Sequence, residues 1–141
     1  MIDCHKVFYA REPALGVAEF RRVLVESGLG TTRPIEDQAR LAAMLSAASL
    51  IVTARPGRPG GPLAGVARCI TDFAWCCYVC ELAVSASAQG TGVGKGLLDE
   101  IRRQVGPGVS VILASMPEAI GFYERVGMAR VPDAFWYRRE Q

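Results

Sequence analysis

The sequence predicts an α/β fold, a mixed sheet with helices on its faces, and three observations support this prediction. Apolar segments of strand composition alternate along the chain with segments whose apolar residues recur at helical spacing. Residues 89–98, QGTGVGKGLL, place four glycines where a strand gives way to a helix. No internal repeat or low-complexity segment interrupts the alternation. Because 141 residues suit one domain, we expect a single domain over residues 1–141.

The first half of the chain predicts two strands, two helices and a turn. Residues 5–11 and 49–55 have the composition of strands. Residues 14–26 and 36–48 predict amphipathic helices, because their apolar residues recur three, four and seven positions apart. The proline and glycine residues at 56–62 predict a turn before the second half begins.

The second half of the chain is more regular and predicts a hairpin followed by alternating helices and strands. Residues 63–73 and 75–84 are expected to form neighbouring antiparallel strands joined by a tight connection. The elements expected after the glycine-rich stretch are a helix with an apolar stripe ending at Val105, a buried strand at 109–115, a helix from Pro117 to Gly127, and a closing strand at 134–140.

The composition is that of an ordinary globular protein. Half of the residues are apolar and the formal net charge is only +2, so we expect neither disorder nor a nucleic-acid partner. The N-terminal residues contain no apolar signal core, and no run approaches 18 apolar residues. We therefore expect no membrane segment and a cytoplasmic location. Five cysteines without a secretion signal argue against a disulfide framework.

The glycine-rich stretch has the wrong spacing for two well-known nucleotide motifs. A P-loop needs four residues between its first glycine and a Gly-Lys-Ser/Thr end, but three residues separate Gly90 from Gly94, and Gly96 replaces the hydroxyl residue. In a dinucleotide-binding fingerprint the third glycine would fall on Lys95 or Leu97. The sequence therefore predicts neither NTP hydrolysis nor a Rossmann site.

The same glycines suit an anion-binding site at the start of a helix. Glycines at 90, 92 and 94 would let successive backbone N–H groups converge on an anion without obstruction by a Cβ atom. Lys95 would add positive charge, and no acidic residue lies between Ala83 and Leu98. A pyrophosphate fits such a group of donors.

Two motifs in this order resemble those of the GNAT superfamily of N-acetyltransferases. Gln89 to Gly94 reads Q-x-x-G-x-G directly after an apolar strand that ends in LAV. Residues 119–128, AIGFYERVGM, are similar to the family's helix ending in Phe-Tyr-Glu-x-x-Gly, one strand further on. The TDF at 71–73 resembles small bacterial members as well, so the likeness covers nearly the whole chain. One departure is Met116, which stands where many members have asparagine.

The resemblance implies a GNAT-like fold and an enzyme that uses acetyl-CoA. The expected architecture is a central, mostly antiparallel sheet with one splayed parallel pair of strands, flanked by about four helices. The expected activity is transfer of an acetyl group to a primary amine, on a small molecule, by direct attack in a ternary complex. Alternatives are a protein or peptide N-acetyltransferase, and a non-catalytic regulatory module that binds acyl-CoA.

The resemblance also assigns a coenzyme A site around the first motif. The pantetheine arm would lie along the end of the strand before the glycines, where the backbone N–H of Val84 would donate to the oxyanion. The pyrophosphate would lie on the glycine-rich stretch. The cofactor-binding residues implied are Leu82, Ala83, Val84, Gln89, Gly90, Thr91, Gly92, Val93, Gly94, Lys95, Gly96 and Tyr123.

Acetyl transfer also requires an acid and a base. Tyr123 matches the family's tyrosine, which gives a proton to the departing thiolate, although a core aromatic would suit its position as well. Glu81 is our preferred base, through water, because it is the only carboxylate of its strand. Asp72 and a water chain remain alternatives. Both carboxylates also suit structural roles, Asp72 as a turn former and Glu81 as a partner for an arginine.

Several other residues suit structural roles better than catalytic ones. The CCYVC segment at 76–80 does not predict a metal site, because Cys77 and Cys80 would point to opposite faces of a strand, so small buried residues are expected. His5 is expected to be structural, and Arg55 and Arg58 to lie in a solvated loop. No metal is expected, the acceptor is expected to be a small amine, and a homodimer remains an open option.

Overall fold

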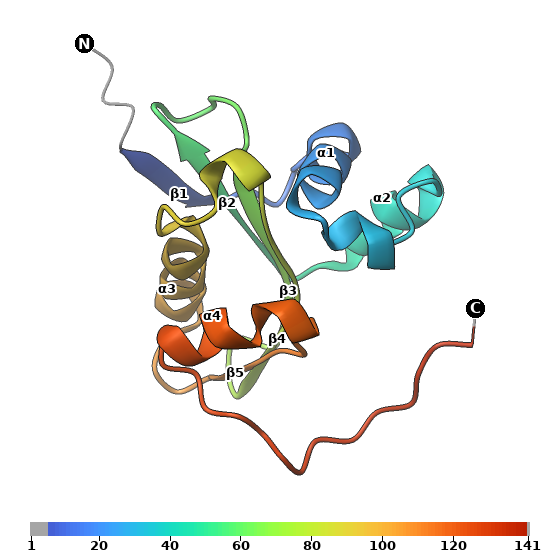
Figure 1. Ribbon diagram of the computed structural model, residues 1–141, viewed down its shortest axis with the longest axis vertical. Helices are drawn as coiled ribbons and strands as arrows, with labels where there is room; N and C mark the ends of the chain where they lie inside the picture. Colours follow the sequence, from blue (N-terminus) through green and yellow to red (C-terminus); the bar gives the residue numbers. More distant parts are fainter. Residues whose placement is uncertain (1–5, 141) are drawn as a thin grey trace.

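The computed structural model describes residues 6–140, in which one five-stranded sheet organises the chain (Figure 1). The strands are β1 Val7–Arg11, β2 Leu50–Pro56, β3 Gly65–Thr71, β4 Cys76–Val84 and β5 Ser110–Ile112. Their order across the sheet is their order along the chain. Neighbours run antiparallel except β4 and β5, which are parallel, and this confirms the predicted mixed sheet.

Four helices flank the sheet, as predicted. They are α1 Val17–Ser27, α2 Gln38–Ala47, α3 Val93–Val105 and α4 Ile120–Arg125, and three 3₁₀ turns connect them to their neighbours: η1 Leu29–Thr32, η2 Ala86–Ala88 and η3 Pro117–Ala119. Helices α1 and α2 lie on one side of the sheet and α3 on the other (Figure 1). Asp37 begins α2 by accepting a hydrogen bond from the backbone N–H of Arg40 at 3.0 Å, and Gly28 ends α1 in the left-handed conformation.

Each face of the sheet has its own hydrophobic core. One core joins α3 to the side chains that alternate along β2, β3 and β4, among them Val52, Cys69 and Cys77, all fully buried. The other joins α1 and α2 to the opposite face, through residues such as Ile51 and Val66. Strand β2 and most of β3 are therefore buried on both sides, which explains their nearly continuous apolar sequences.

Strands β4 and β5 pair for only three residues. The parallel register runs from Cys76 beside Ser110 to Tyr78 beside Ile112 and stops there, although β4 continues to Val84. The prediction that the strand before the glycine-rich stretch splays from the strand after it is therefore confirmed. The last six residues of β4 have no neighbouring strand on that side among residues 6–140.

A β-bulge lies in β4 next to the point where the two strands part. Arg68 and Cys69 are consecutive on β3, but their partners on β4 are Glu81 and Val79, so Cys80 is an extra residue. A bulge bends its strand and increases the local twist. The bulge at Cys80 therefore turns the second half of β4 away from the line that β5 follows.

The prediction of a closing strand at 134–140 is wrong. Residues 129–140 form no strand or helix, and every one of them is exposed. Strand composition records a preference, but a strand also needs a partner, and no other segment of residues 6–140 pairs with this one. The expected buried strand at 109–115 shortens to Ser110–Ile112 for a related reason, because β4 leaves it after three residues.

The expectation that Arg55 lies in a solvated loop is also wrong. Arg55 is in β2, is 7% exposed, and pairs at 2.9 Å with both Glu12 and Glu19. These two carboxylates neutralise the guanidinium and tie α1 and the end of β1 to the sheet. His5 lies outside the described residues. Between residues 6 and 140 no helix is both long and apolar enough to cross a membrane.

Candidate functional site

The end of β4 presents backbone groups toward the side that β5 has left. The backbone N–H of Ser85 donates to Ala64 on the β3 side at 2.8 Å. Because successive peptide groups of a strand point in opposite directions, those of Val84 and Leu82 point toward the open side. Gln89 follows this pattern, since its Nε2 donates to the carbonyl of Val84 at 2.9 Å. Two of the predicted pantetheine contacts, Leu82 and Val84, therefore face the splay, and Ala83 faces β3.

The glycine-rich stretch forms the turn that starts α3. Gly90 and Gly92 both have positive φ, 78° and 91°, which side-chain-bearing residues rarely adopt. Gly92 is the N-cap of α3, and no side chain caps the helix there. The backbone N–H groups of the first turn, including Val93, therefore have no partner within the helix. Such donors, with the helix dipole behind them, favour an anion.

Gly94 and Gly96 also allow close packing, a role that is additional to the anion binding predicted for Gly94. A Cβ atom on Gly94 would come 2.8 Å from the ring of Phe122 on α4. A Cβ atom on Gly96 would overlap the phenol of Tyr9 on β1. These two glycines let a ring from α4 and a ring from β1 reach the backbone of α3. The stretch thus combines two glycines that shape a turn with two that admit neighbours.

The other two polar residues of the stretch have intramolecular partners. The Lys95 Nζ donates to Asp99 Oδ2, one helical turn further on, at 2.8 Å. Both side chains are more than half exposed, so this pair contributes little to stability and leaves the ammonium free to move to an anion. The Thr91 hydroxyl donates to the carbonyl of Ala88, which stabilises the turn between η2 and α3.

Tyr123 packs on α4 against the core that contains α3. Its ring meets that of Phe122 edge to face, with 5.0 Å between the ring centres. Burial raises the pKa of the Tyr123 phenol above its usual value of 10.0, and no hydrogen bond offsets this effect. The phenol therefore keeps its proton at neutral pH and can act as a donor.

Glu81 lies on the opposite face of the sheet, in a buried cluster with two arginines. Its side chain is 1% exposed. The Arg68 Nε donates to Oε2 at 2.8 Å, and the Arg33 Nε donates to Oε1 at 3.1 Å. Arg33 also donates to the carbonyl of Cys80, at 2.9 Å, and so holds the bulge. Glu81 therefore has the structural role that the sequence analysis named as its alternative, as partner of an arginine.

Asp72, the other candidate base, shapes the connection between β3 and β4. Its Oδ1 accepts hydrogen bonds from the backbone N–H groups of Ala74, Trp75 and Cys76, at 2.9, 2.8 and 3.1 Å. These bonds, that of Trp75 first, lower the pKa of the carboxyl group. The expected role as a turn former is confirmed.

The cysteines divide between the core and the surface. Cys69 and Cys77 are fully buried, as expected of small core residues, but Cys76 is exposed and Cys80 is half-buried. Residues 6–140 contain no group of three His, Cys, Asp or Glu side chains that could hold a metal ion.

Arg33, Arg68 and Phe122 are residues of the site that the sequence analysis did not single out. Arg68 lies opposite Glu81 in the antiparallel pair, so counting register along the hairpin could have matched the two. That count is correct only with the bulge at Cys80, which has no sequence signature. Arg33 comes from a connection 48 residues away in sequence, and Phe122 reads as an ordinary core aromatic.

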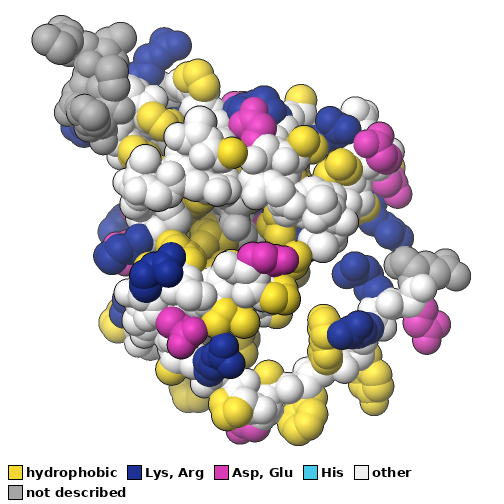
Figure 2. All heavy atoms as spheres, viewed as in Figure 1, with side chains coloured by type: hydrophobic (Ala, Val, Ile, Leu, Met, Phe, Trp, Pro, Cys, Tyr) yellow, Lys and Arg dark blue, Asp and Glu magenta, His cyan; other side chains and the backbone are white. Residues whose placement is uncertain are grey.

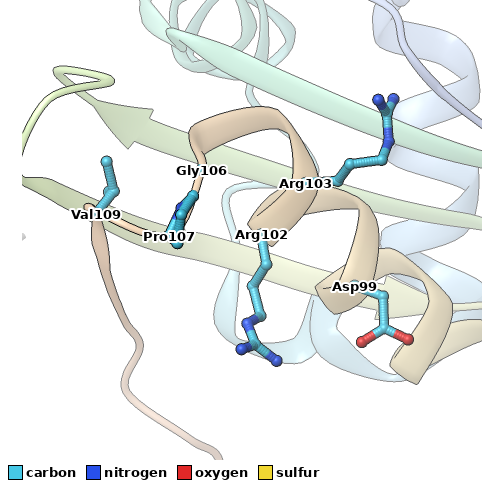
Figure 3. A pocket seen from close by; sticks show the side chains of 6 residues that line it. All are labelled: Asp99, Arg102, Arg103, Gly106, Pro107 and Val109. Carbon is cyan, nitrogen blue, oxygen red and sulfur yellow. The ribbon is translucent and has the colours of Figure 1, made fainter.

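Two shallow pockets lie near the glycine-rich turn and α3. Neither pocket is lined by the residues whose backbone N–H groups are free at the start of α3. One, of about 410 Å³, lies at the end of α3 (Figure 3), where Arg102 and Arg103 point away from each other and so do not converge on one anion. The other, of about 350 Å³, lies between α1 and the end of β4. Ser85 lines it and donates from Oγ to Glu26 at 2.7 Å.

A splayed parallel pair of strands, followed by an uncapped helix N-terminus and a protonated tyrosine, is the arrangement expected of a class of proteins that accept an extended, phosphate-bearing acyl carrier beside a strand. The comparison with protein families agrees. The protein-family model described as the acetyltransferase (GNAT) domain matches residues 28–136, which are more than half of the chain. The chain belongs to the GNAT acetyltransferase family, whose members use acetyl-CoA.

Individual relatives support the same assignment. Serotonin N-acetyltransferase 2, chloroplastic, of Oryza sativa subsp. japonica is 30% identical over 119 residues, which are 80% of this chain and 59% of that protein. The chain spans between 48% and 59% of the lengths of the curated relatives it matches.

Solved structures share the fold at lower identity. A GNAT family acetyltransferase from Streptococcus pneumoniae TIGR4 superposes with a TM-score of 0.71 at 22% identity, and covers 96% of this chain and 100% of that one. The ribosomal-protein-alanine N-acetyltransferase of Brucella melitensis biovar Abortus 2308 has a TM-score of 0.69 at 19% identity, with 95% and 100% covered.

Proposed function

We propose that this protein, as a single domain, transfers an acetyl group from acetyl-CoA to a primary amine of a small molecule, by direct attack in a ternary complex. The observation that carries the proposal is the splay of β4 from β5 just before the glycine-rich turn. Pantetheine can pair with the exposed backbone of Leu82 and Val84 as a strand would. The pyrophosphate then meets the free N–H groups of α3, helped by Lys95.

The reaction balances with groups that this chain supplies. The protonated amine first loses one proton to water, and its nitrogen then attacks the thioester carbon to form the C–N bond. The nitrogen loses a second proton to water as the amide forms. A backbone N–H at the end of β4, that of Val84 in our assignment, donates to the oxyanion. When the C–S bond breaks, the phenol of Tyr123 gives its proton to the thiolate, and solvent returns a proton to the phenol.

The proton that leaves the amine needs an acceptor. Two arginines already donate to the carboxylate of Glu81, one to each oxygen, with a further bond from Arg68 to Oε1. Few lone pairs are left for a catalytic water. We therefore propose a water chain as the route of the proton, with Glu81 as its alternative and the Glu81→Gln variant as the test.

The proposed acceptor rests on chemistry and on the printed name of one relative. The rice relative is named for serotonin, a small primary amine, and it is the relative at 30% identity. The Brucella enzyme is named for a ribosomal protein, but its 19% identity supports the fold alone. A small amine is thus our first candidate and a peptide or protein amine the second. We also propose a cytoplasmic location, although the rice relative is chloroplastic.

The test is a panel of amines and peptides with acetyl-CoA, scored by release of free thiol. Thiol release with one or more small amines, above the rate of acetyl-CoA hydrolysis, would support the proposal. Release only with peptides would replace the small amine with a protein acceptor. Binding of acetyl-CoA without any transfer would favour the non-catalytic acyl-CoA module, in which the phenol of Tyr123 would have no catalytic role.

A further inference from the structure

The buried cluster around Glu81 contains one more arginine than its carboxylate requires. Arg68 already pairs with both oxygens of Glu81, from Nε to Oε2 at 2.8 Å and from Nη2 to Oε1 at 3.0 Å. This two-bond arrangement matches a guanidinium to a carboxylate. Arg33 adds a second positive charge, so two arginines and one glutamate leave the cluster with a formal charge of +1. Because an uncompensated charge is costly to bury, the second arginine needs a reason of its own.

The β-bulge at Cys80 supplies that reason. Cys80 is the extra residue of β4, and the extra residue of a bulge is left out of the ladder of hydrogen bonds between strands. Nη2 of Arg33 donates to the carbonyl of Cys80 at 2.9 Å, while its Nε donates to Oε1 of Glu81 at 3.1 Å. One planar guanidinium therefore holds two consecutive residues of β4 in a fixed geometry.

These bonds lie where the gap between β4 and β5 begins. Tyr78 is the last residue of β4 that pairs with β5, and Leu82 and Val84 lie beyond the bulge with their peptide groups toward the gap. Figure 2 shows the surface hollowed above α4, the helix that follows β5, with hydrophobic side chains inside the hollow. The bulge therefore sets the direction in which β4 leaves β5.

Arg33 reaches the bulge from the connection between η1 and α2, which lies on the side of the sheet opposite α3 (Figure 1). Its side chain is 24% exposed, and Nη1 donates to the hydroxyl of Thr32 at 3.0 Å. Arg21 on α1 holds the same connection, because its Nε donates to the carbonyl of Ile35 at 2.8 Å. The connection is thus fixed to α1 by one arginine and to β4 by another.

We propose that Arg33 is a positioning residue for the acyl carrier, because its bonds to the bulge keep β4 turned away from β5. The peptide groups of Leu82 and Val84 then stay free to pair with the pantetheine arm. The inference rests on the proposed function, and Arg33 acts through β4 without touching the carrier or the amine. Removing its guanidinium would leave the carbonyl of Cys80 without this donor, so the bulge would be less firmly fixed and the gap would lose its shape.

The test compares two ligands that share a pyrophosphate group. Coenzyme A carries the pantetheine arm and ADP does not, so only coenzyme A needs the gap. In Arg33→Met we expect the Kd of coenzyme A to rise by about 10-fold or more, as for loss of a hydrogen bond from a charged donor. The Kd of ADP should change by less than about twofold. Titration calorimetry on the full chain measures both.

Arg21→Met is the matched control, because it removes the guanidinium that holds the same connection to α1 and spares the bonds to the bulge. Both Kd values should stay within about twofold of wild type in this variant. Arg68 and Glu81 remain a neutral pair in Arg33→Met, so we expect that variant to fold, and circular dichroism would check this. Arg33→Lys keeps the charge without the planar fork and should show the same split between the ligands with a smaller rise.

Two results would overturn the role of Arg33. One is an unchanged Kd of coenzyme A in both Arg33 variants. The other is an equal loss of affinity for coenzyme A and ADP, which would place the damage outside the gap. A wild-type protein that binds coenzyme A but transfers no acetyl group would refute the proposed function alone, whereas one that does not bind coenzyme A would overturn both.

Discussion

The ring of Phe122 lies against the backbone of Gly94, so that a Cβ atom on residue 94 would come within 2.8 Å of the ring. Phe122 belongs to α4 and precedes Tyr123, whereas Gly94 belongs to the first turn of α3. The contact therefore fixes the candidate anion-binding turn and the candidate acid relative to each other. Neither α3 nor α4 alone would fix the position of the turn relative to Tyr123.

The first prediction follows from that contact. Gly94→Ala should push Phe122 and with it Tyr123 away from α3, so that kcat falls and the protein loses about 1–3 kcal/mol of stability through overpacking. Steady-state kinetics and urea unfolding would measure both. Gly108→Ala is the control, because a Cβ atom there meets nothing within 4 Å and its φ is not positive. Equal behaviour of the two variants would refute the packing role.

The second prediction concerns the anion site. Coenzyme A at about 100 times its Kd should stabilise the protein by roughly 2.7 kcal/mol and raise its Tm. Gly92→Val should abolish this shift, because its side chain enters open space at the N-terminus of α3. Gly28→Val is the matched control, with a similar φ of +87° and equally open surroundings. An undiminished shift in the Gly92 variant would remove the assignment of the turn to pyrophosphate.

The third prediction isolates one oxygen atom. Tyr123→Phe should keep the edge-to-face contact with Phe122 and the affinity for coenzyme A, and should lower kcat by about 100-fold or more. Because burial raises the pKa of Tyr123 above its usual value of 10.0, the phenol stays protonated at neutral and mildly alkaline pH, so its ionisation should not reduce activity there. A fully active phenylalanine variant that binds coenzyme A would refute this acid and leave the fold assignment intact.

The fourth prediction separates the two roles of Glu81. Glu81→Gln leaves the guanidinium groups of Arg33 and Arg68 without a counter-charge in a buried site, which typically costs about 3–5 kcal/mol. If Glu81 is structural, unfolding in urea should show this loss while folded protein keeps most of its kcat. If Glu81 is the base, kcat per folded molecule should fall by about 100-fold or more.

The fifth prediction concerns pH. Hydrogen bonds from Arg55 lower the pKa of Glu12 and of Glu19 below the usual 4.5. A carboxyl group with a lowered pKa stabilises the folded state above its unfolded pKa and loses that effect as pH falls through the folded pKa. Wild type should therefore exceed Glu12→Gln in stability by about 1–3 kcal/mol at pH 7, with a gap that narrows below pH 4.5. A gap independent of pH would contradict the pairing.

The order of the strands and helices could be predicted from the sequence because periodicity reports burial. The apolar stripe of α3 and the continuous apolar sequence of β2 each fit one pattern, since both faces of β2 are covered. The prediction of a strand at 134–140 is wrong because it rests on composition alone. Its composition fits a strand, but composition carries no information about whether a partner strand is present in the same chain.

The candidate site was predictable in its backbone and less so in its side chains. A turn at Gly90 and Gly92 could be predicted because glycine is the residue that adopts positive φ without strain, and both residues do so in the structure. The packing role of Gly94 depends on a ring from α4, 28 residues later in sequence, which no local pattern reveals. Likewise, the arginines around Glu81 come from two distant segments, so sequence could offer that pairing only as an alternative.

The extra residue at Cys80 has a consequence for how the site could be lost. Because Val79 and Glu81 already pair with adjacent residues of β3, deleting Cys80 would leave both side chains on their present faces and would restore an uninterrupted ladder. The straightened β4 could then go on pairing with the chain beyond Ile112. Loss of this one residue would therefore let β4 and β5 pair along their whole length. The fold would be preserved, but the gap between the two strands that could admit an acyl carrier would be closed.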